Sequence, residues 1–192
     1  ILDNPSNLEE TRAEAGFNLA ISYLEKKDYA AVNAIIEMAD TFGEAFAKAA
    51  LGAGVRLPLA GGAVFISMAD VDKPRAAALA ARFEELDAAI LATAGTAAAL
   101  AEAGIAAVVV RKVSEGRPHA VDLMVNGDIQ LVVNTASGGR AHRDGTAIRR
   151  GALELGVPYS ATIPGALAVA EAIASLRRRR LSLRPLQEWA GR

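Results

Sequence analysis

A chain of 192 residues has room for one well-packed domain and a small additional segment, because domains usually contain about 100 to 150 residues. Its 21 Lys and Arg against 22 Asp and Glu exclude the strongly basic surface that is typical of proteins binding nucleic acid or anionic lipid. The lack of cysteine excludes disulfides and thiol chemistry. We therefore expect a small molecule or another protein as partner, with no nucleic acid and no membrane.

The apolar residues, 52% of the sequence, occur in short runs. None of these runs approaches the roughly 18 residues that a membrane-spanning helix needs. The first residues lack the basic and then apolar order of a signal peptide. We therefore expect a soluble, cytoplasmic protein. We also expect no cofactor and no metal.

Residues 1–40 are predicted to form a helical hairpin. Ser6 and Glu9 have the spacing of a capping box, and Asp28 is placed to cap a second helix. The order of small and aromatic residues around Tyr23 and Tyr29 is similar to one tetratricopeptide-like unit, but a single unit cannot bury its own apolar faces. A helical interaction module, assisted by the arginines at 177–180, therefore stays open as an alternative function.

Residues 41–62 are predicted to form a helix and then a linker. Thr41 and Glu44 again have the spacing of a capping box. Residues 55–62 contain Pro58 and the pair Gly61-Gly62, and such residues interrupt regular secondary structure and are typical of linkers between domains. We expect this linker to be exposed and to lead into the main domain at residues 63–192.

From residue 63 onward, short apolar stretches alternate with helix-like ones. We expect strands at 64–67, 89–93, 107–111, 131–134 and 157–159, and helices at 72–86, 96–103, 119–126, 144–155 and 164–177. The strands are apolar at consecutive positions, as are parallel strands that are covered on both faces. The alternation predicts an α/β fold with a doubly wound parallel sheet, in which ligands bind at the carboxyl ends of the strands.

Polar and basic residues follow four of these predicted strands. They are Ser67 and Lys73 after the first strand, residues 93–96 after the second, Lys112 after the third, and Asn134, Thr135, Ser137 and Gly138 after the fourth. The turn Thr93-Ala94-Gly95-Thr96 precedes a helix, whose first N–H groups and partial positive charge suit an anion. Two ammonium groups, hydroxyls and amides at one sheet edge predict a phosphate-binding site.

Four strings of residues, in this order and spacing, resemble the C-terminal, effector-binding domain of the carbamoyl phosphate synthetase large subunit. They are TFGEAFAKA at 41–49, DKPR at 72–75, KVSEGRPH at 112–119 and NTASG at 134–138. The third string is the most selective, and the resemblance covers residues 41–192 but not 1–40. It implies a methylglyoxal-synthase-like, Rossmann-like fold, a three-layer α/β/α sandwich with a five-stranded parallel sheet.

The resemblance also implies an allosteric domain that binds nucleotide effectors such as UMP or IMP, in an enzyme of pyrimidine and arginine biosynthesis. The implied phosphate positions are Ser67, Lys73, Thr93, Gly95, Thr96 and Lys112, and the base and ribose positions are Val113, Asn134, Asp144 and Ile148. An ornithine-binding edge is implied at Tyr159, Ser160 and Thr162.

The implied partners are the synthetase domains of the large subunit and the glutaminase small subunit. By itself the chain is then expected to have no catalytic residue and to be the regulatory part of an ATP-dependent ligase. Two positions depart from the family pattern. Ala136 stands where many relatives have a second threonine, and Ser160-Ala161 replaces a more polar pair. We therefore expect weaker responses to UMP and to ornithine.

The main alternative is an enzyme that shares the implied fold, methylglyoxal synthase. Its catalytic aspartate lies in a Gly-Gly-Asp loop, and a general base has to reach the proton that it removes. The corresponding loop here, Gly116-Arg117-Pro118-His119, has no carboxylate, and Asp122 lies one helical turn further on. His119 could serve as an acid or base, but a histidine at a helix start is more often structural.

Overall fold

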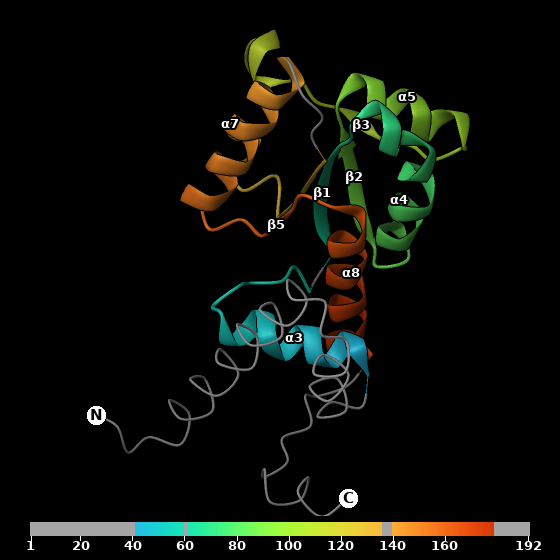
Figure 1. Cartoon of the computed structure of the whole chain (residues 1–192), viewed down its shortest axis with the longest axis vertical. Helices are drawn as coiled ribbons and strands as arrows, with labels where there is room; N and C mark the ends of the chain where they lie inside the picture. The colour runs from blue at the N-terminus through green and yellow to red at the C-terminus, as the bar shows by residue number, and fades with distance from the viewer. Residues whose placement is uncertain (1–40, 60, 136–139, 179–192) are drawn as a thin grey trace, which may run out of the picture. The chain divides into compact units, whose positions relative to one another are not determined.

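The computed structural model describes residues 41–59, 61–135 and 140–178, which separate into two compact units (Figure 1). The larger unit is Arg56–Ala170, and the described part of the smaller unit consists of residues 41–55 and 171–178. The predicted helical hairpin at 1–40 lies outside the described residues, as do residues 136–138 of the fourth string and the end of the arginine run. Within the described part of the chain, no helix combines the length and the apolar composition needed to cross a bilayer.

Five parallel strands form one sheet in the order β3-β2-β1-β4-β5, which confirms the predicted fold class. The strands are β1 (Gly62–Ser67), β2 (Ala88–Ala92), β3 (Val108–Val109), β4 (Leu131–Asn134) and β5 (Tyr159–Ser160). In the central strand, Val64 is in register with Ile90 of β2 and with Leu131 of β4. The chain thus moves outward from β1 to β3, returns, and continues on the other side of β1.

Helices cover both faces of the sheet and complete the three layers. They are α4 (Ala76–Glu84), α5 (Ala94–Glu102), α6 (Ala120–Val125) and α7 (Arg140–Glu154), with two short 3-10 helices, η1 (Asp70–Arg75) and η2 (Val113–Glu115). Helix α8 (Ile163–Arg178) follows β5. Helices α4 and α5 pack on each other and on β2, whereas α6 and α7 pack on each other and α7 packs on β4 and β5. Figure 1 shows α4 and α5 on one side of the strands and α7 on the other.

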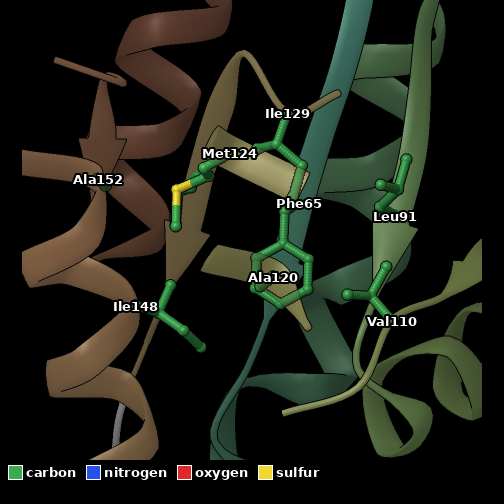
Figure 2. Close-up of a cluster of buried hydrophobic side chains, with 9 residues drawn as sticks. Phe65, Leu91, Val110, Ala120, Met124, Ile129, Ile148 and Ala152 are labelled. Atoms are coloured by element: carbon green, nitrogen blue, oxygen red, sulfur yellow. The ribbon is translucent and has the colours of Figure 1, made fainter. Parts of the chain in front are cut away.

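One buried cluster holds α6 and α7 against the sheet. It consists of Phe65, Leu91, Val110, Ala120, Met124, Ile129, Val132, Ile148 and Ala152. Figure 2 shows the ring of Phe65 between Leu91 and Val110 on one side and Met124 and Ile148 on the other. Because burial of each large apolar side chain contributes about 1.5 to 3 kcal/mol, this cluster fixes the position of α7 along the sheet.

In the smaller unit, helix α3 (Phe42–Gly52) begins where the sequence predicts a cap. The Thr41 hydroxyl oxygen accepts a hydrogen bond from the backbone N–H of Glu44 at 3.1 Å, and the Glu44 carboxylate pairs with Lys48 at 2.9 Å. A Cβ atom at Gly43 would lie only 2.6 Å from the carbonyl oxygen of Glu171. The glycine therefore permits α3 to approach the backbone of α8 closely.

Most of the predicted elements are present with bounds shifted by one or a few residues, and the strand predicted at 107–111 is reduced to Val108–Val109. The helix predicted at 72–86 begins as η1 and becomes α-helical only at Ala76, since Pro74 has no N–H to donate. Helix α7 begins at Arg140, four residues before its predicted start. Residues 55–62 are not exposed throughout: Leu57 is 8% exposed, and Gly62 already belongs to β1.

Candidate anion-binding site

The carboxyl ends of β1 and β4 lie side by side where the direction of the strand order reverses. Ser67 ends β1 and is in register with Asn134, which ends β4. The Asn134 Nδ2 atom donates to the Ser67 carbonyl oxygen at 3.4 Å, and the backbone N–H of Thr135 donates to the same oxygen at 3.0 Å. In open α/β sheets this reversal leaves a crevice in which ligands bind. Ser67 and Asn134 therefore lie beside the place where a ligand is expected to bind.

Two buried threonine hydroxyls hold the loop that follows β1. Thr96 Oγ1 accepts from the backbone N–H of Met68 at 3.0 Å, and Thr135 Oγ1 accepts from that of Ala69 at 3.1 Å. The Thr93 hydroxyl donates to Thr96 Oγ1 at 3.2 Å. Thr96 is fully buried and Thr93 is 3% exposed, so the Thr93 hydroxyl acts on the loop only through Thr96.

Lys73 reaches from η1 to the turn that opens α5. A Cβ atom built on Gly95 would lie 2.9 Å from Lys73 Nζ, so the ammonium group lies directly over this glycine. Gly95 is in the first turn of α5, whose N-cap residue is Thr93. The first N–H groups of a helix lack partners inside the helix and carry partial positive charge. The ammonium group and the helix start thus face the same small volume.

A carboxylate also occupies this volume. Asp70 Oδ1 lies 2.6 Å from Lys73 Nζ. This hydrogen bond lowers the pKa of Asp70, and the charges of Lys73 and, less strongly, of Lys112 lower it further. Lys112 is the N-cap residue of η2, and its charge acts on the Asp70 carboxylate without a direct ion pair between the two.

Next to Lys112 lies an open pocket between η2 and the first turns of α7. It is lined by Lys112, Val113, Ser114, Glu115, Arg143, Asp144 and Ala147. Asp144, 9% exposed, accepts hydrogen bonds from the backbone N–H of Ser114 at 3.0 Å and from its hydroxyl at 2.8 Å. Ile148 lies one helical turn after Asp144 and does not line the pocket. Its side chain belongs to the buried cluster instead.

Arg149 is a cation of this region that the sequence analysis did not single out. Its guanidinium group donates to Asn134 Oδ1 and, at 3.4 Å, to the hydroxyl oxygen of Thr146. The side-chain amide of Asn134 is therefore held at both ends, by Arg149 and by the Ser67 carbonyl group. One feature of the sequence could have pointed to Arg149: it directly follows Ile148, which the resemblance placed near the base and ribose.

The residues of the implied ornithine edge lie on and after β5, one strand further from the lysines than Asn134. Ser160 Oγ donates to the Thr162 carbonyl oxygen at 2.8 Å and accepts from the Thr162 backbone N–H at 3.4 Å. Tyr159 is 42% exposed. These three residues form a group of their own, apart from the two lysines.

The carboxylate of Asp122 is engaged at the start of α6. It accepts from the backbone N–H of His119 at 2.9 Å and lies 2.8 Å from the guanidinium group of Arg117. His119 Nδ1 accepts in return from the backbone N–H of Asp122 at 3.4 Å, which completes a capping box. Among the described residues, no group of three or more histidine and carboxylate side chains is placed to hold a metal ion.

Comparison with known proteins identifies this fold. Residues 75–161 match the family described as the MGS-like domain. The chain is 47% identical over 150 residues to a carbamoyl phosphate synthase large chain of Gemmatimonas aurantiaca, which covers 78% of this chain and 14% of that one.

Two further relatives are C-terminal sections of such large chains. The chain is 48% identical over 152 residues to the section from Aquifex aeolicus, covering 77% of this chain and 28% of the relative. It is 48% identical over 149 residues to the section from Methanopyrus kandleri, covering 77% and 27%. The chain thus spans less than a third of the length of each of these relatives. We conclude that it contains an MGS-like domain and is related to the C-terminal section of carbamoyl phosphate synthase large chains.

Proposed function

We propose that this chain is a regulatory domain that binds the phosphate group of a nucleotide effector such as UMP or IMP. The observation that carries the proposal is the Lys73 ammonium group over Gly95 at the start of α5, with Lys112 at the end of the next strand along the sheet. Two ammonium groups and the partial positive charge of a helix start favour a phosphate, which offers three acceptor oxygens.

The pocket beside Lys112 has the character needed for the nucleoside part. Val113 packs against the buried cluster and offers an apolar wall, and Asp144 offers a carboxylate. Each Asp144 oxygen accepts one hydrogen bond from Ser114 and keeps a second lone pair, so Asp144 is able to accept from an N–H of a base or a hydroxyl of a ribose. Because Lys112 borders both places, one nucleotide would occupy both.

We propose regulation as the role because the relatives are parts of a ligase. In the intact enzyme the domain would act on the synthetase domains of the large chain and on the glutaminase subunit, in the cytoplasm, for pyrimidine and arginine biosynthesis. Ornithine, if bound, would take the group at Tyr159, Ser160 and Thr162. Its binding is expected to be weak because the Ser160 hydroxyl is already paired with the Thr162 backbone.

We predict that the pure chain forms no methylglyoxal from dihydroxyacetone phosphate. Elimination of phosphate needs a carboxylate that is close to the substrate and ready to remove a proton. Asp122 is instead held by the His119 backbone and by Arg117. A colorimetric assay of methylglyoxal checks this, and steady formation that scales with the amount of protein contradicts the regulatory proposal.

We predict that Lys73→Ala and Lys112→Ala each weaken binding of UMP, IMP or inorganic phosphate by roughly 10-fold to 150-fold, since a charge-assisted hydrogen bond contributes about 1.5 to 3 kcal/mol. Isothermal titration calorimetry on the full chain measures this. Arg178→Ala, which removes an exposed cation from the smaller unit, is the control and should leave affinity unchanged. Thermal unfolding should hardly change in any of the three variants.

The double variant tests whether the two lysines share one anion. If they do, the two losses are not additive, and a coupling of about 0.5 to 3 kcal/mol is expected in the double-mutant cycle. Unchanged affinity in Lys112→Ala, or an equal loss in Arg178→Ala, places the phosphate elsewhere and overturns the proposal.

A further inference from the structure

The proposed phosphate site contains an acid that phosphate binding does not require. Asp70 Oδ1 lies 2.6 Å from Lys73 Nζ, the same ammonium group that lies over Gly95. The charge of Lys112 also acts on this carboxylate. A phosphate that paired with Lys73 would therefore need the position that Asp70 holds in this structure.

Asp72, the second acidic residue of η1, has different hydrogen-bond partners from Asp70. The carboxylate of Asp72 accepts hydrogen bonds from the Thr135 hydroxyl and from Arg75, and these two bonds lower its pKa. Asp72 is thus part of the frame that holds the loop after β1. Among the residues that the structure describes, the ion-pair partner of the Asp70 carboxylate is Lys73 of the proposed site, and Asp70 does not belong to this frame.

The Asp70–Lys73 pair is able to open at little cost. The Asp70 side chain is 91% exposed, and an ion pair between exposed side chains contributes little to stability. The two residues are three positions apart in one 3-10 helix, so the carboxylate remains beside the ammonium group even after it has turned away. There it still repels a bound phosphate, which carries a charge of about −1.5 to −2.

We infer that Asp70 is a built-in competitor of the phosphate: it neutralises Lys73 in the empty site, has to release it when an anion binds, and so lowers the affinity. This inference rests on the proposed function. It also predicts selectivity for phosphate, because an anion with one charge and one acceptor would gain no more from Lys73 than Asp70 already provides. A phosphate gains more, since its three oxygens reach both lysines and the start of α5 together.

The test is calorimetric titration of the full chain with inorganic phosphate and with UMP at low salt. Asp70→Asn removes the charge and keeps the size of the side chain. We expect it to tighten phosphate binding by roughly 2-fold to 5-fold, the range typical of exposed charge pairs. The gain should shrink as salt is added, because salt screens exposed charges.

Two further variants make the comparison specific. Asp128→Asn makes the same change of net charge at an exposed aspartate that precedes β4, at the amino end of that strand, and should leave affinity unchanged. Asp70→Glu restores the charge and should return the affinity to that of the unaltered chain. An equal gain in Asp128→Asn would mean that only net charge matters, and would overturn the inference.

The possible failures are distinguishable. If the unaltered chain binds phosphate and Lys73→Ala weakens it, but Asp70→Asn has equal or lower affinity, then the site is correct and the competitor role of Asp70 is wrong. If neither the unaltered chain nor Asp70→Asn binds phosphate or UMP, both the proposed function and this inference are wrong.

Discussion

The lack of a side chain at Gly95 matters because the Lys73 ammonium group lies directly above it. We predict that Gly95→Ala weakens phosphate binding several-fold, though less than Lys73→Ala does, because the new methyl group displaces the end of a flexible side chain. Stability should stay the same or rise by up to about 1 kcal/mol, since alanine favours a helix more than glycine does. Calorimetry and thermal unfolding measure the two effects separately.

The control for this variant is Ala98→Gly, on the exposed side of the same helix. This variant replaces alanine by glycine at a position away from Lys73. The stability of the chain should therefore fall, while its affinity for phosphate stays the same. An affinity loss in Ala98→Gly as large as in Gly95→Ala would show that helix stability, and not the position of the ammonium group, controls binding.

For single residues, the sequence predicted the positions of the lysines but not the hydrogen-bond partners of the threonine hydroxyls. Lys73 and Lys112 follow from one rule, that ligand-binding groups gather at the carboxyl ends of parallel strands. The same rule could not tell that the hydroxyl of Thr96 holds the Met68 backbone, because that partner depends on how two loops pack. Arg149 was missed since its contact with Asn134 depends on the position of α7 along the sheet.

Among the elements, the two helix starts that carry a local side-chain cap were predicted to within one residue. Thr41 caps α3 through its hydroxyl, and His119 caps α6 reciprocally with Asp122. Both caps are local, since all of their atoms lie within four consecutive residues. Helix α7 begins four residues earlier than predicted, and its later turns are fixed by the buried cluster.

The order of the strands could not be predicted from the alternating pattern alone. Right-handed crossovers permit several orders for five parallel strands. The order found here depends on pairs that are distant in the chain, such as Ser67 with Asn134. It is this order that puts the reversal between β1 and β4, and so brings the residues after both strands to one crevice.

In the whole molecule, the proposed site depends on the larger unit alone. All five strands, helices α4 to α7 and every proposed ligand-binding residue belong to the larger unit, Arg56–Ala170. Helix α8 begins in this unit and ends in the smaller one. We therefore propose that residues 1–40 and the helix at 41–52 are separable from the MGS-like domain, with the boundary in the segment before β1.

We predict that a fragment of residues 56–192 folds and binds phosphate as the full chain does, because it retains the sheet, its covering helices and Leu57. A fragment of residues 63–192 lacks Leu57 and the first residue of β1, so it should be less stable by about 1.5 to 3 kcal/mol, the value for one buried leucine. Urea unfolding compares the two fragments, and calorimetry with phosphate compares the longer one with the full chain.

Hydrogen exchange gives this prediction a finer test. Amides of residues 171–178 should lose protection in the longer fragment, because they belong to the smaller unit and α3 approaches Glu171 closely at Gly43. Amides of β1, β2 and β4 should keep their protection, since the strands that pair with them and the helices that cover them are retained. If the strands lose protection together with the end of α8, or if the longer fragment is unfolded, the two units depend on one common core and the proposed boundary is wrong.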